Sequence, residues 1–94
     1  MQAKVKAIKT KVTAAQKDVQ KQMDKLADSK HPLAKTINTS LAKVQTALTP
    51  QETNMAFLMS QDNLTEKKIQ AAQKAADKAL ESYNSEIKLA KAVV

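Results

Sequence analysis

The chain of 94 residues contains no cysteine and no glycine, and it has two prolines and two aromatic residues, Phe57 and Tyr83. Without cysteine it can form neither a disulfide framework nor a thiolate site, and cysteine usage leaves its compartment open. Without glycine it cannot build a glycine-rich phosphate-binding loop, and almost none of its residues suit tight turns that need positive φ. Nearly every residue that is present is compatible with helix, so the composition predicts an all-α protein.

The basic residues are all lysines, and 16 of them against 9 acidic residues give a net charge of +7. Because arginine is absent, the surface lacks the planar fork that makes two-bond contacts with phosphate, guanine or carboxylate. No apolar run exceeds five residues. The sequence therefore predicts no membrane-spanning segment and no secretory signal, although a mature secreted form would have the same properties.

The spacing of apolar residues predicts one domain over residues 1–94, built from three long antiparallel rods. The first rod should span about residues 2–27, the second about 33–59, and the last about 64–93. The expected seam of the first is Val5, Val12, Val19 and Leu26 at heptad spacing, with Ile8, Ala15 and Gln22 as a weaker second row. The seam of the second is Leu33, Ile37, Leu41, Val44 and Leu48. That of the last is Ile69, Ala72, Ala76, Leu80, Tyr83, Ile87, Ala90 and Val94.

A helix start is expected in the middle rod, at Thr49-Pro50. Thr49 is a favourable N-cap, Pro50 suits the first helical position, and Glu52 can reach back to the Thr49 amide. Two nearly collinear pieces on either side of Pro50 would together match the length of the first rod. We therefore predict an antiparallel three-helix bundle with the middle helix broken at Pro50.

Two other folds stay open at this stage. A four-helix bundle would result if the chain turned at Pro50. A long helical hairpin or an oligomeric coiled coil would result if residues 50–93 formed one helix, because the heptad phase survives the polar segment 60–66. Against that helix, Asn63 followed by Glu66 is a plausible capping pair for a separate final helix.

The densest apolar run follows Pro50 and contains Met55, Phe57, Leu58 and Met59. No charge interrupts it, so we expect it to be buried near one end of the core. Its side chains point in too many directions for one narrow stripe, and methionine adapts to many partners. The same four residues are therefore also a candidate apolar binding patch.

Few groups in the sequence could support catalysis. His31 is the single histidine, and it precedes a proline in an expected loop. Asp77 and Glu81 lie one helical turn apart, but Lys74 and Lys78 interleave them, which is typical of a solvated charged face. The sequence therefore predicts no catalytic residue, no metal, no cofactor and no small-molecule substrate, and we expect the protein not to be an enzyme.

The first seventeen residues contain five lysines and no acid, and they give the main functional lead. The candidate interaction face consists of Lys4, Lys6, Lys9, Lys11 and Lys17. Such a segment favours contact with an acidic protein, nucleic acid phosphates, or an anionic envelope or membrane surface. Nucleic acid is disfavoured because nothing stacks on bases, and a membrane because valines stand where bulky anchors are needed.

These observations predict a non-enzymatic helical protein that binds a protein partner or self-associates, since alanine-rich seams bury little area alone. Lysine-mediated, non-specific nucleic-acid binding is one alternative. In size, helix content and basic charge the chain is similar to small bacterial helical proteins, including bacteriocin immunity proteins. That likeness of bulk properties implies a second alternative, an immunity or inhibitor protein acting on a membrane-associated target.

Overall fold

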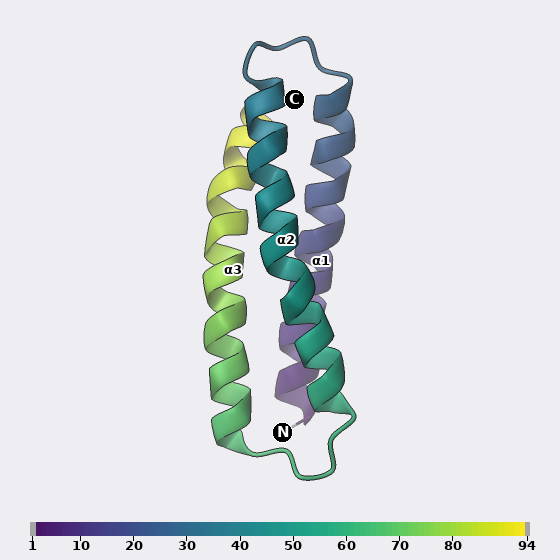
Figure 1. Ribbon diagram of the computed structural model, residues 1–94, viewed down its shortest axis with the longest axis vertical. Coiled ribbons are helices and arrows are strands. Elements are labelled where there is room, and N and C mark those ends of the chain that lie inside the picture. Colours follow the sequence, from purple (N-terminus) through teal and green to yellow (C-terminus); the bar gives the residue numbers. More distant parts are fainter. Residues whose placement is uncertain (1, 94) are drawn as a thin grey trace.

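The computed structural model describes residues 2–93, which form three helices running up, down and up (Figure 1). α1 spans Gln2–Ala27, α2 spans Ala34–Met59 and α3 spans Glu66–Val93. The bundle is a slim rod of 51 × 17 × 16 Å. The loop between α1 and α2 lies at the same end as the last turn of α3 (Figure 1). The all-α three-helix bundle predicted from the sequence is confirmed.

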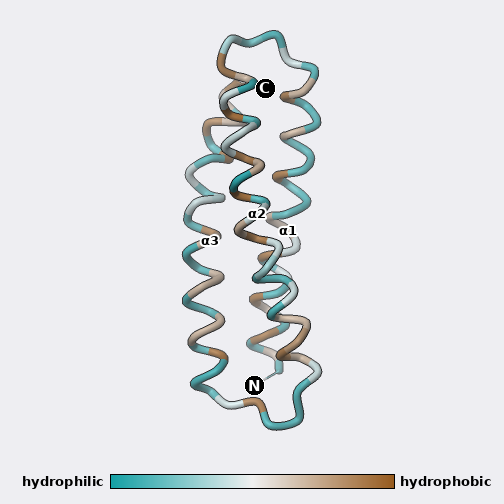
Figure 2. The backbone as a smooth tube through the Cα atoms, viewed as in Figure 1, coloured by the Kyte–Doolittle hydropathy of each residue, from teal (hydrophilic) through white to brown (hydrophobic). Residues whose placement is uncertain are grey.

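One stripe of each helix faces the common axis, and hydrophobic segments recur between hydrophilic ones along each helix (Figure 2). Every member of the seam predicted for the first rod is buried, including Gln22. Leu33 is an exception in the second seam, because it lies at the N-cap of α2 and is 54% exposed, while Ala34 is buried beside it. Leu80 and Tyr83 are half-buried, and Val94 lies outside the described residues.

Pro50 lies inside α2, which continues through it. The break expected at this proline does not occur, and Thr49 is not an N-cap; its hydroxyl donates to the Gln45 carbonyl at 2.9 Å. The reason lies in the packing, because Leu48 and Met55 are seven residues apart and both fully buried, so the apolar stripe keeps its phase across Pro50. Burial on both sides outweighs the roughly 3 kcal/mol that proline costs in a helix interior.

The segment 60–65 separates α2 from α3. Thr65, not Asn63, begins the last helix, since the Thr65 hydroxyl accepts a hydrogen bond from the Lys68 amide N–H at 3.3 Å. A hydroxyl in this position satisfies one of the donors that a helix start leaves free. The four-helix bundle and the single helix over residues 50–93 are both wrong.

Two side-chain amides bridge α1 and α2 and show how the two helices are aligned. Gln45 Nε2 donates to the Gln16 carbonyl at 3.1 Å, and Gln2 Nε2 donates to the Met59 carbonyl at 3.3 Å. Because the two helices run antiparallel, these contacts place the first turns of α1 beside the last turns of α2. Met59 thereby comes close to the lysine-rich segment.

A polar cluster ties α1 to α3 around the Asp18 carboxylate. Tyr83 Oη donates to Asp18 Oδ2 at 2.5 Å, Gln22 Nε2 donates to Oδ1 at 3.3 Å, and Lys91 Nζ lies 3.7 Å from Oδ2. The Tyr83 hydrogen bond is the main cause that holds the pKa of Asp18 below its usual value. Burial, together with the hydrogen bond to the carboxylate and its charge, raises the pKa of Tyr83 to about 12.

Tyr83→Phe is expected to lower the free energy of unfolding by about 1–2 kcal/mol near pH 7, because it removes a hydrogen bond to a charged group, which solvent weakens at this half-buried position. Folding raises the pKa of Tyr83 from its ordinary value of 10.0, so its stabilisation is present below pH 10 and is lost as pH rises toward 12. The difference between wild type and variant should therefore shrink across that range. Denaturant unfolding at neutral and alkaline pH measures it.

Tyr83 is the one tyrosine of the chain, so the ultraviolet absorbance of tyrosinate titrates it directly. We expect a midpoint near 12 in the folded protein and near 10 in denaturant. Asp18→Asn should move the folded midpoint down. A folded midpoint equal to that in denaturant would show that the Tyr83–Asp18 hydrogen bond does not form in solution.

Candidate functional site

The apolar run that follows Pro50 is divided by the helix into inner and outer residues. Met55 is fully buried and Leu58 nearly so, whereas Phe57 is 58% exposed and Met59 is half-buried. At 3.6 residues per turn, Phe57 lies roughly 200° around the helix from Met55, so one helix cannot bury both against a single core. The prediction that the run is buried is therefore wrong for Phe57. Of the four patch residues, only Phe57 and Met59 reach the surface, and they lie on different sides of α2.

The five candidate lysines also divide into two groups. Lys4 and Lys11 lie on the side of α1 next to α3, where they line a hollow with Gln73. Lys4 Nζ is 3.3 Å from Glu66 Oε1, but both side chains are largely exposed. An exposed pair of this kind contributes little to stability, because water and salt screen it.

The other three lysines, Lys6, Lys9 and Lys17, surround a groove on the opposite side of α1. The groove has a volume of about 360 Å³, and Met59 reaches it from the end of α2. Its remaining lining consists of small side chains of α1, namely Thr10, Thr13 and Ala14. We call this surface the lysine groove.

No acidic side chain lines the lysine groove, and none of its three lysines lies within ion-pair distance of a carboxylate of residues 2–93. For the residues that α1 contributes, the absence of acids follows from the sequence, since the first acidic residue of the chain is Asp18. That carboxylate is turned to the other side of α1, toward Tyr83 and Lys91. The groove thus combines concentrated positive charge with one adaptable thioether side chain.

Sequence reasoning missed the small residues of the lysine groove, and it named Met59 in the candidate apolar patch without placing it beside the lysines. Thr10, Thr13 and Ala14 stand at helical spacings of three and four between the lysines, so the sequence did carry a signal for a small-residue surface. Nothing in the sequence places Met59 beside them. That neighbourhood depends on how α1 and α2 pack.

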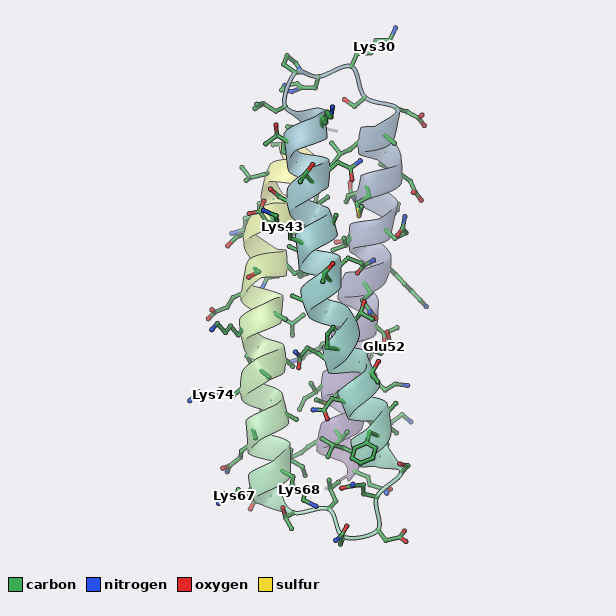
Figure 3. The ribbon with its side chains drawn as sticks, viewed as in Figure 1. Lys30, Lys43, Glu52, Lys67, Lys68 and Lys74 are labelled. Carbon is green, nitrogen blue, oxygen red and sulfur yellow. The ribbon has the colours of Figure 1, made fainter. Side chains whose placement is uncertain are left out.

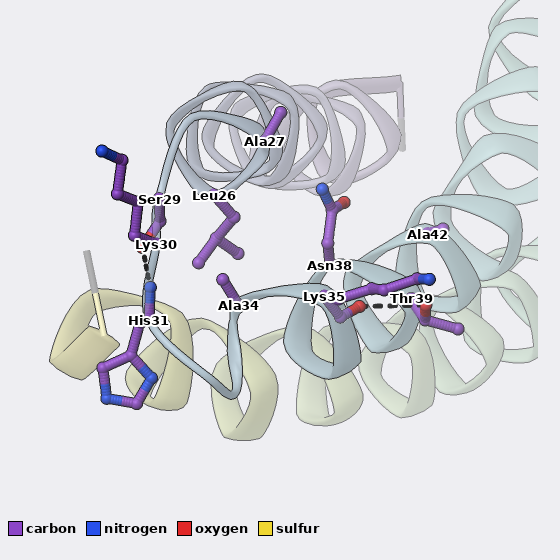
Figure 4. A pocket seen from close by; sticks show the side chains of 10 residues that line it. All are labelled: Leu26, Ala27, Ser29, Lys30, His31, Ala34, Lys35, Asn38, Thr39 and Ala42. Carbon is purple, nitrogen blue, oxygen red and sulfur yellow. Dashed lines mark hydrogen bonds between the residues drawn. The ribbon is translucent and has the colours of Figure 1, made fainter.

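A second hollow, of about 510 Å³, lies where the α1–α2 loop meets both helices. His31 belongs to its lining, but its imidazole points away from Leu26 and from the middle of the hollow (Figure 4). His31 Nδ1 accepts a hydrogen bond from the Leu33 amide N–H at 3.1 Å, so this nitrogen stabilises the turn before α2. The lining contains no carboxylate that could act together with it.

Within residues 2–93, no three histidine or acidic side chains come together in a way that could hold a metal ion. None of the three described helices combines the length and the hydropathy that crossing a bilayer requires. Comparison of the chain with protein-family models, with curated proteins and with solved structures gave no match.

Proposed function

We propose that this chain is a non-enzymatic interaction module that binds an acidic protein surface through Lys6, Lys9 and Lys17. The observation that carries the proposal is the gathering of these lysines around one groove with no carboxylate partner among the described residues. A cluster of unpaired like charges raises the local potential, which attracts an oppositely charged partner and speeds its association.

An acidic protein fits this surface better than nucleic acid or a membrane. Lysine alone neutralises phosphates without reading bases, and stacking needs exposed aromatic side chains nearby. The two aromatic residues lie elsewhere, Tyr83 between α1 and α3 and Phe57 on the outer side of α2. A membrane would require bulky apolar anchors beside the charges, and the lysine groove offers a single half-buried methionine.

The test is a binding titration of poly-L-glutamate with wild type and with the triple variant Lys6→Gln, Lys9→Gln, Lys17→Gln. Glutamine keeps helix propensity while removing charge. We expect the variant to bind about tenfold more weakly at moderate salt, because each of the three lysines contributes a few tenths of a kcal/mol or more. Added salt should also weaken binding of poly-L-glutamate to the wild type, because it screens exposed charges.

The matched control is the triple variant Lys67→Gln, Lys74→Gln, Lys78→Gln. These lysines are exposed on α3, where Lys67 and Lys74 point away from the bundle (Figure 3). Either triple variant lowers the net charge by three, from +7 to +4. Equal losses in both variants would mean that net charge alone governs binding. Tighter binding of a DNA duplex or of anionic vesicles than of poly-L-glutamate would contradict an acidic protein as the partner.

A further inference from the structure

We propose that the lysine groove receives an acidic helix of the partner protein, laid along α1 so that it adds a fourth rod to this end of the bundle. The inference rests on the proposed function and specifies the conformation of the partner. The evidence for it is the shape of the lysine groove, which has small side chains between its lysines.

The first observation is the distribution of side-chain size along α1. Lys6 and Lys17 are eleven residues apart, which is roughly 16 Å of helix. Between them, Lys9 lies near the Lys6 end. The rest of the surface that α1 contributes is formed by the small side chains of Thr10, Thr13 and Ala14. Packed helix axes lie about 8–10 Å apart, and small side chains at the contact favour the short end of that range. In the middle of the lysine groove the side chains are therefore small enough for a helix to approach closely. The lysines at its two ends can form ion pairs with acidic residues of that helix.

The second observation is that part of this surface is already satisfied. The Thr10 hydroxyl donates to the Lys6 carbonyl at 2.9 Å, so its donor needs no new partner when a helix covers it. Met59 borders the same groove from α2, and its flexible thioether can fill the space beside an apolar residue of the incoming helix. Covering Thr10 therefore leaves no unpaired donor there, whereas the Thr13 hydroxyl has no hydrogen-bond partner among residues 2–93 and must receive one from the incoming helix.

The third observation is charge. A helix that presents acidic residues about eleven positions apart on one face, with small or apolar residues between them, would place a carboxylate near each charged end. The outer side of α3 does not offer the same match. It also carries lysines around an exposed alanine, Ala71, but Asp77 and Glu81 stand three positions after Lys74 and Lys78 and offset their charge.

The experiment uses three peptides of about 16 residues with the same composition, followed by fluorescence anisotropy. The first is helical with its glutamates at the two ends of one face. The second has the glutamates spread around the helix, and the third exchanges the positions of a terminal proline and a central residue, which breaks the helix. We expect the first peptide to bind about tenfold more tightly than the other two. A preformed helix with matching charges loses less conformational entropy when it binds.

A protein variant tests the groove itself. Ala14→Trp fills the middle of the groove while all three lysines stay, and Ala14 is exposed, so the fold should tolerate it. We expect Ala14→Trp to weaken binding of the first peptide about tenfold and to leave binding of the other two unchanged. The control Ala71→Trp should change the affinity for none of the three peptides.

Each contrary result identifies what is wrong. Equal affinity for the three peptides, or no effect of Ala14→Trp on the first, would overturn the helical partner while poly-L-glutamate binding through the lysines still stands. Failure of every acidic peptide and of poly-L-glutamate would overturn the proposed function as well. Circular dichroism of each variant confirms that it is folded.

Discussion

Met55→Ala is expected to lower the free energy of unfolding by about 2–5 kcal/mol, the range for removing a fully buried methionine side chain from a core. Met55 has no exposed surface. Four of the six buried residues that α3 contributes to the core are alanines, so this helix offers few large side chains that could move into the space. For a protein of this size the loss corresponds to roughly 10–30 °C in Tm. Thermal melting and denaturant unfolding measure it.

Phe57→Ala is the matched control for Met55→Ala, since it removes a larger side chain two positions away. Phe57 is 58% exposed, and alanine has the higher helix propensity, so the expected change is within about 0.5 kcal/mol. A loss as large as that of Met55→Ala would mean that another copy of the chain or a different arrangement of α2 covers Phe57. Light scattering over a concentration series would distinguish the two, because assembly makes the melting point depend on concentration.

Pro50→Ala is expected to raise the free energy of unfolding by about 2 kcal/mol, or roughly 10 °C in Tm. Alanine restores the amide N–H that the helix would donate to the Thr46 carbonyl, and it removes the contact between that carbonyl and the proline ring. The gain is less than the full proline penalty because alanine also makes the unfolded chain more flexible. Pro50 is exposed, so the substitution leaves the core unchanged.

Pro32→Ala is the control for Pro50→Ala. Pro32 lies in the loop before α2, where proline limits the unfolded chain without interrupting a helix. Its replacement should be neutral or destabilising by up to about 1 kcal/mol. If Pro50→Ala instead destabilised the protein, the proline would be needed for the course of α2 along the bundle.

The lysine groove and the Asp18 cluster differ in how far the sequence could predict them. The first seventeen residues predicted a basic segment, but a helix distributes residues 100° apart, so Lys4 and Lys11 face α3 while Lys6, Lys9 and Lys17 surround the groove. The hydrogen bond between Asp18 and Tyr83 joins residues 65 positions apart. No local pattern predicts such a pair.

The sequence by itself determined the helices and most of their inner faces, because helix formation and the 3.6-residue period are local properties that composition and spacing express directly. α1 ends where the sequence predicted, and its seven seam residues are all buried. Only the tertiary structure decided whether Pro50 breaks α2, whether Phe57 is covered, and which lysines share a surface with Met59. Each of these depends on the free energy of packing between segments that are distant in the chain. This packing free energy outweighs local preferences of about one to three kcal/mol, and no local sequence pattern predicts it.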